Sequence, residues 1–92
     1  MSLDILEPPV RTLKPYLALH ILRDVVPTIL DESQPITKRI AISYTYLKIA
    51  ENLGKLPPEE IRKDPSKWSS QTFYKIADFL VWVAIDMIRK FI

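Results

Sequence analysis

The chain has 92 residues, a size that allows one hydrophobic core and leaves no room for a second. Hydrophobic residues make up 48% and charged residues 26%, which is typical of a globular domain and excludes a disordered or membrane-spanning chain. The formal net charge of +2 is close to balance, so composition allows contact with nucleic acid without indicating it.

Three residue counts argue against certain folds and certain kinds of active site. The absence of cysteine excludes a disulfide scaffold, a thiolate metal site and a cysteine nucleophile. The single histidine argues against a histidine-based metal site and against a Ser-His-Asp triad. One glycine among eight prolines argues against β-hairpins, whose tight turns favour glycine. We therefore expect no catalytic residues, no metal and no cofactor.

Two features of the sequence bear on compartment and source. The N-terminus has neither the basic nor the apolar region of a secretory signal, and the most apolar stretch, Phe79 to Ile88, is shorter than the roughly 20 residues of a bilayer helix. These observations predict a cytoplasmic protein. Asparagine and glutamine number only three and cysteine is absent, a depletion of thermolabile residues that is typical of thermophiles.

The N-terminal third is predicted to hold an extended arm followed by a helix. Residues 1–14 read as a proline-rich arm, and residues 15–92 as one helical domain. The first helix is expected from Pro15 to about Asp31, with a kink at Pro27 favoured over a split. Its apolar stripe follows helical spacing and consists of Ala18, Leu19, Leu22, Val25, Val26, Ile29 and Leu30.

A second helix is expected from about Ile36 to Leu53, ending at Gly54, the only glycine. Its apolar residues form two adjacent seams, which predicts packing against two neighbours. One seam holds Ile36, Ile40, Leu47 and Ala50 with Ser43 in register, and the other holds Ile42, Tyr46, Ile49 and Leu53.

The remaining segments are predicted to be a short helix, a turn and a last helix. Residues 56–63 read as the short helix, and residues 64–68 as a turn that places Trp68 on the core. Ser69 or Ser70 is expected to cap the last helix. The core stripe of that helix is Phe73, Ile76, Ala77, Leu80, Ala84, Met87, Ile88 and Phe91. The fold class is therefore all-α, a compact bundle of three main helices plus one short helix.

The last helix carries more apolar surface than one core stripe uses. Tyr74, Val81, Ile85 and Ile92 form a second seam, while Phe79, Trp82 and Arg89 lie further round the helix among charged residues. One interpretation is a central helix packed by both other helices. The other is contact with a partner protein, because aromatic residues and arginine dominate interaction hot spots. Trp82 favours the second interpretation, since it lies opposite the middle of the core stripe.

Basic residues suggest a nucleic-acid alternative. Segment 36–56 has a local balance of +3, and the start of the last helix resembles a helix-turn-helix recognition element. The candidate contacts are Lys38, Arg39, Lys67, Ser69, Ser70 and Lys75. The competing interpretation is a solvated charged face, favoured because the last helix is apolar nearly all round after Lys75.

His20 is the remaining candidate for a catalytic residue. Tyr16 and Asp24 lie one turn on either side of it, a spacing that orients an imidazole for acid–base work. No nucleophile, second histidine or glycine-rich loop accompanies it, so the sequence favours a solvated helix histidine over a catalytic one.

Over its whole length, and through no single motif, the chain resembles the small helical accessory subunits that bind B-family DNA polymerases in thermophilic archaea. That resemblance implies a non-catalytic subunit that holds or stabilises a replicative polymerase, with nucleic acid nearby in the assembly. Two alternatives stay open. One is a viral or regulatory helix-turn-helix DNA-binding protein, and the other is a homodimer built on the apolar last helix.

Overall fold

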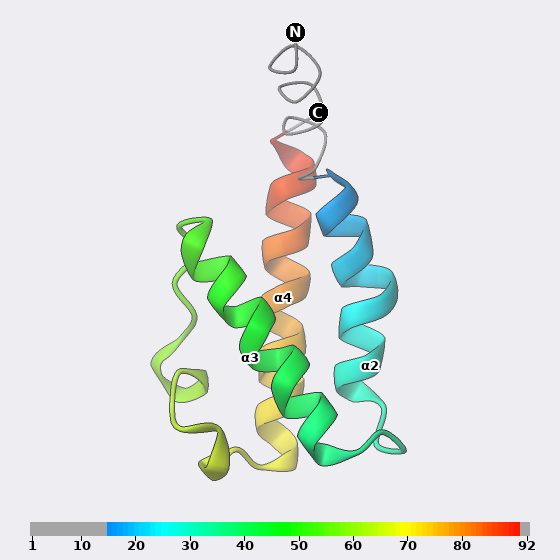
Figure 1. Cartoon of the computed structure of the whole chain (residues 1–92). Helices are drawn as coiled ribbons and strands as arrows, with labels where there is room; N and C mark the ends of the chain where they lie inside the picture. Colours follow the sequence, from blue (N-terminus) through cyan, green and yellow to red (C-terminus); the bar gives the residue numbers. More distant parts are fainter. Residues whose placement is uncertain (1–14, 91–92) are drawn as a thin grey trace, which may run out of the picture.

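The computed structural model describes residues 15–90; the predicted arm, residues 1–14, and the last two residues lie outside this part. Over the described residues the fold is all-α, as predicted. A first helix over residues 15–30 packs beside α3 (Ile36–Asn52) and α4 (Ser70–Arg89), as Figure 1 shows. The short helix expected in segment 56–63 is only a single 3-10 turn, η2 (Glu59–Ile61), and a second such turn, η3 (Pro65–Lys67), follows it.

The first helix continues through Pro27 without being divided. It consists of α-helix over residues 15–20, a π-helical turn, η1 (Ile21–Val25), and α2 (Val26–Leu30). In the π-helical turn the Val26 N–H donates to the carbonyl of Ile21, five residues back. Proline lacks an N–H group and its ring clashes with the preceding turn, so helices adjust next to it. The chain therefore stays helical at Pro27 by widening the turn before it.

The π-helical turn changes which side chains of this helix face the core. Ala18, Val25, Val26 and Ile29 are buried as predicted. The prediction for Leu19 is wrong, because its side chain is 44% exposed, while Ile21 is only 1% exposed and takes a core position. The extra residue in the turn breaks the 3.6-residue period on which the prediction relied.

Helix α3 ends at Asn52, one residue before the predicted Leu53, and Gly54 stops it as predicted. Gly54 has φ +83°, a conformation that glycine adopts without steric cost. Its N–H donates to the Glu51 carbonyl at 2.9 Å, and the Lys55 N–H donates to the Ala50 carbonyl at 2.8 Å. These two bonds form a Schellman motif, which satisfies the last carbonyls of the helix and fixes the direction in which Lys55 leaves it.

The core side of α3 differs from the prediction at its N-terminal end. Ser43, Leu47 and Ala50 are buried as expected, but Ile36 is 54% exposed. Arg39 is buried instead, with only 9% of its surface exposed. Its Nε donates to the Ile29 carbonyl at 2.8 Å, and its guanidinium lies 4.4 Å from the centre of the Phe73 ring. The expectation that Arg39 belongs to a solvated face is wrong, because its head group joins three helices.

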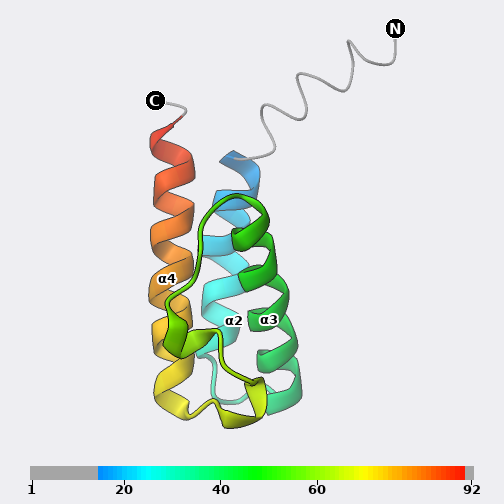
Figure 2. The same cartoon turned by 90° about the vertical axis from the view of Figure 1, so that its left-hand side faces the viewer.

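The segment between α3 and α4 crosses in front of these two helices in Figure 2. Pro57 and Ile61 are fully buried, and Trp68 packs against the core as predicted, edge-on to Phe73 at 6.0 Å between ring centres. Ser69 caps α4, as predicted, because its N–H donates to the hydroxyl of Thr72 in a capping box. The core side of α4 follows the predicted stripe from Phe73 to Met87 and adds one residue that the prediction missed, Val83. Ile88 is only half-buried, and Phe91 lies outside the described residues.

Candidate interaction surface on helix α4

Helix α4 has a buried side and an exposed side. Leu80 is completely buried, as are its core neighbours, whereas Tyr74 is 54%, Trp82 52% and Ile85 44% exposed. In Figure 2 α4 lies at the edge of the bundle, and no other element of residues 15–90 lies against its outer side. We use the name outer face for the arc of α4 formed by Tyr74, Asp78, Val81, Trp82, Ile85 and Arg89.

The second apolar seam predicted for α4 is only partly covered by the rest of the molecule. Val81 is half-buried and packs against the edge of the core. Tyr74 and Ile85 are exposed, so the interpretation of a central helix packed on this side by both other helices is wrong for them. Ile92, the last member of the seam, lies outside the described residues.

Trp82 is exposed, yet its surroundings hold its ring in place. The Phe79 ring, which is half-buried, lies 6.2 Å from the Trp82 ring, centre to centre. Lys55, fixed by the end of α3, places its Nζ 5.3 Å from the centre of the Trp82 ring. Such a contact between an ammonium and a tryptophan face is attractive. Two neighbours from different elements therefore orient the indole while leaving half of it open to solvent.

Lys55 is kept in this position by an ion pair with Asp86 of α4. The hydrogen bond from Lys55 lowers the pKa of Asp86, and the same bond raises the pKa of Lys55. Lys90 adds a weaker contact, with its Nζ 3.5 Å from the Asp86 carboxylate. The sequence did not indicate this pair, because its members are 31 residues apart and no local pattern connects them.

Two charged residues of the outer face are available to a partner. Asp78 and Arg89 are both exposed, and neither forms an ion pair with another residue of the described part of the chain. They flank Trp82 and Ile85 along α4. The outer face thus combines exposed aromatic and aliphatic surface with one charge of each sign, Asp78 within it and Arg89 at its C-terminal end.

The candidate nucleic-acid contacts are not equally available. Arg39 is buried, and Lys75 is paired with Glu60 at 2.7 Å. Ser69 takes part in the cap of α4, where its hydroxyl lies 3.2 Å from that of Thr72. The other three candidates, Lys38, Lys67 and Ser70, are exposed, and they lie at the end of the bundle where α3 and α4 begin (Figure 1).

His20 makes two hydrogen bonds, one within the first helix and one that connects this helix to α3. Its Nδ1 lies 3.0 Å from the Asp24 carboxylate, the neighbour predicted one turn away. Its Nε2 lies 2.8 Å from the hydroxyl of Tyr46, which the sequence did not indicate, while Tyr16 is 69% exposed. A neutral ring with its proton on Nδ1 satisfies both bonds. The bond to Tyr46 gives His20 a structural role as a link between the first helix and α3.

Within residues 15–90 no three histidine, aspartate or glutamate side chains are grouped as a metal site would require. None of the helices in the described part is both long and apolar enough to cross a bilayer. Comparison with family models, curated proteins and solved structures gave no match to this chain.

Proposed function

We propose that this chain is a non-catalytic accessory subunit that binds a larger partner protein through the outer face of α4. The single observation that carries the proposal is the exposure of Tyr74, Trp82 and Ile85 along one arc of one helix. Exposed apolar side chains gathered on one side of a small domain are typical of an association site. From the resemblance stated above, we propose a replicative DNA polymerase of a thermophilic archaeon as the partner, in the cytoplasm.

The composition of the outer face supports a protein partner. Tryptophan, tyrosine and arginine are the residues most often found at interaction hot spots, and all three occur here as Trp82, Tyr74 and Arg89. The contacts of Trp82 with Phe79 and Lys55 restrict its ring before binding. A side chain that is already ordered loses less conformational entropy when a partner covers it.

Site-directed photocrosslinking tests the proposal. A benzophenone amino acid replaces Asp78, an exposed residue of the outer face, in one variant and Thr45, an exposed residue of α3, in a control variant. In native extract the first variant should crosslink to one larger protein, and the second should not. Equal crosslinking from both positions would contradict a binding surface on α4. Crosslinking of the first variant only to a second copy of this chain would replace the larger partner with a homodimer.

Two alanine variants separate binding from folding. Leu80→Ala removes a fully buried side chain and should cost about 2–5 kcal/mol of stability. Trp82→Ala should change the melting temperature little, yet weaken partner binding by about 2 kcal/mol or more, as truncation of a hot spot does. Thermal melts of both variants check the first expectation. If Trp82→Ala unfolds as early as Leu80→Ala, Trp82 serves the fold and the proposal fails.

A further inference from the structure

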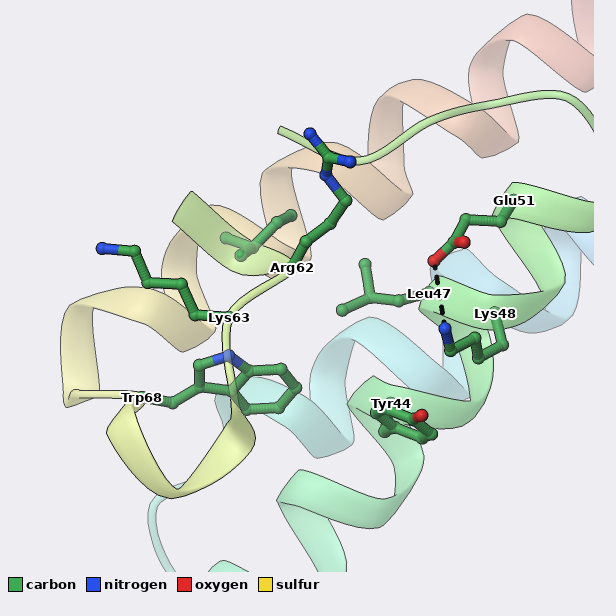
Figure 3. A pocket seen from close by; sticks show the side chains of 8 residues that line it. Tyr44, Leu47, Lys48, Glu51, Arg62, Lys63 and Trp68 are labelled. Atoms are coloured by element: carbon green, nitrogen blue, oxygen red, sulfur yellow. Dashed lines mark ion pairs between the residues drawn. The ribbon is translucent and has the colours of Figure 1, made fainter. Parts of the chain in front are cut away.

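A pocket with a volume of about 250 Å³ lies away from α4, between α3 and the segment that carries η2 and η3. Tyr44 and Leu47 line it from α3, and Ile61 and Trp68 line it from the other segment (Figure 3). Helix α4 contributes no residue to its lining. The pocket is therefore separate from the outer face, and binding at the pocket is independent of the function proposed for α4.

The inner surface of this pocket is apolar and shaped by fixed residues. Leu47 and Ile61 are 4% and 1% exposed, so they form its buried floor. The Trp68 ring is held edge-on to Phe73 with an angle of 81° between the ring planes, and Tyr44, which is 48% exposed, forms the open wall. Pockets for cofactors and drug-sized ligands occupy roughly 300–1,000 Å³. This one is smaller and suits a single bulky side chain.

The rim of the pocket is positively charged. It carries Lys48, Arg62 and Lys63 against one carboxylate, Glu51, which lies 3.7 Å from Lys48. Arg62 and Lys63 are exposed and have no ion-pair partner among residues 15–90. Figure 3 shows them on the loop side of the pocket, opposite Lys48 and Glu51. Two cations that form no ion pair with the described residues therefore border an apolar cavity. The hydrogen bond from Lys75 lowers the pKa of the Glu60 carboxyl, and the charge of Lys63 adds to this lowering.

We propose that this pocket binds an acidic peptide segment of a partner protein, with one leucine or phenylalanine side chain in the cavity. Carboxylates beside that anchor meet Arg62 and Lys63, and arginine and carboxylate match in charge and in hydrogen-bond geometry. The aliphatic floor fits a hydrocarbon side chain. It offers no hydrogen-bonding group to the edge of a nucleic-acid base.

The aromatic residues also favour a peptide over a single-stranded nucleic acid. Non-specific binding of single strands uses exposed aromatic faces on which bases stack. The Nζ of Lys48 lies 5.4 Å from the centre of the Tyr44 ring and occupies space over it. Trp68 is half-buried, and its indole nitrogen is inaccessible to solvent. The two rings thus form walls of a cavity, not a stacking platform.

The test uses defined probes and the full chain. A fluorescein-labelled acidic nonapeptide with phenylalanine at its centre is the main probe, and the same peptide with alanine at the centre tests the anchor. Oligothymidylate tests for nucleic acid. Binding is measured by fluorescence polarisation and by the indole N–H signals of the two tryptophans in nuclear magnetic resonance spectra. Trp68 lies in the pocket and Trp82 does not, so the spectrum contains its own control.

Two double variants with the same change in charge test the rim. Arg62→Glu with Lys63→Glu reverses the charge at the pocket, and Lys38→Glu with Lys67→Glu reverses two exposed cations elsewhere. The phenylalanine peptide should shift the Trp68 signal but not the Trp82 signal. It should bind about ten- to a hundredfold more tightly than the alanine peptide, because the anchor buries a large apolar side chain. The pocket variant should lose most of this binding and the control variant little.

Several outcomes would overturn the inference. Oligothymidylate that shifts Trp68 and binds as tightly as the phenylalanine peptide assigns the pocket to nucleic acid. No saturable peptide binding up to about 1 mM, or equal binding of the two peptides, removes the anchor site. Equal losses in both charge variants mean non-specific attraction. If no partner binds the outer face of α4, all of these results stay the same, because Trp82 and its neighbours do not line the pocket.

Discussion

Replacing Arg39 by methionine should destabilise the fold far more than replacement of its neighbour Lys38. The last four carbonyls of a helix have no partner within that helix, and the Ile29 carbonyl belongs to this group because α2 ends at Leu30. The Nε of Arg39 donates to it at 2.8 Å from α3. A positive charge is also favourable at the C-terminal end of a helix.

The expected loss follows from the contacts of Arg39. A hydrogen bond from a charged donor contributes about 1.5–3 kcal/mol. The contact with the Phe73 ring, at 4.4 Å, adds about 0.5–2 kcal/mol. Methionine keeps the apolar stem but makes neither interaction and leaves a buried carbonyl unsatisfied. We expect Arg39→Met to lower the free energy of unfolding by about 2–4 kcal/mol, allowing for some relief from no longer burying a charge.

Urea denaturation followed by circular dichroism measures this difference. In a domain of this size, 1 kcal/mol corresponds to roughly 4–8 °C in melting temperature, so thermal melts provide a second estimate. Lys38→Met is the matched control, since Lys38 is exposed on the same turn and should stay within about 0.5 kcal/mol of the original protein. Equal stability of the two variants would refute the assigned role, because water or improved apolar packing would then compensate for the guanidinium.

Four further predictions follow from other parts of the structure. Ser43 is completely buried, and its hydroxyl has no hydrogen-bond partner among residues 15–90, so Ser43→Ala should raise the free energy of unfolding by about 1 kcal/mol. A loss of stability in a urea titration would show that the hydroxyl is hydrogen-bonded. The methyl group of Gly54→Ala would meet no neighbouring atom, but alanine would have to adopt the φ of +83° that glycine adopts freely. Thermal melts should therefore show a loss of stability of about 1–2 kcal/mol, and an unchanged melting temperature would contradict this backbone strain. The hydrogen bond from Lys55 lowers the pKa of Asp86 below its ordinary 3.8, so the pair stabilises the fold above that pH and the contribution is lost as pH falls through the lowered pKa. Asp86→Asn should therefore weaken the dependence of stability on pH in the acid range, and identical acid titrations would count against the pair. Duplex DNA should bind weakly and without sequence preference at physiological salt, because Arg39 and Lys75 are already engaged; specific binding near 10⁻⁸ M, roughly, would favour the helix-turn-helix alternative.

The parts of the fold that were predictable from sequence depend on local signals. Gly54 marks the end of α3 because only glycine adopts its φ angle freely, and this signal needs no knowledge of the rest of the chain. The assignments of Leu80 to the core and Trp82 to the surface likewise follow from the helical period of α4 alone. α4 is a regular helix from Ser70 to Arg89, so the period holds along its length.

The errors arise where the structure depends on residues distant in sequence or on an irregular turn. Leu19 and Ile21 exchange roles because the π-helical turn before Pro27 breaks the regular period. Arg39 looks like a surface residue, since its burial depends on a carbonyl ten residues earlier and on a ring of α4. The pair of Lys55 and Asp86 is invisible for the same reason.

The core of the bundle is complete without the outer face of α4. Leu80, Val83 and Ala84 are at most 1% exposed, whereas the exposed apolar residues of the outer face remain 44–54% exposed. Burial of a large apolar side chain contributes about 1.5–3 kcal/mol relative to full exposure. Folding leaves these side chains partly exposed, so the free energy of burying the rest of their surface is available to a partner that covers the outer face. Exposed ion pairs contribute only about 0–1 kcal/mol. For the partner proposed above, we therefore expect most of the binding free energy to come from Trp82 and its apolar neighbours, and we expect Asp78 and Arg89 to orient it.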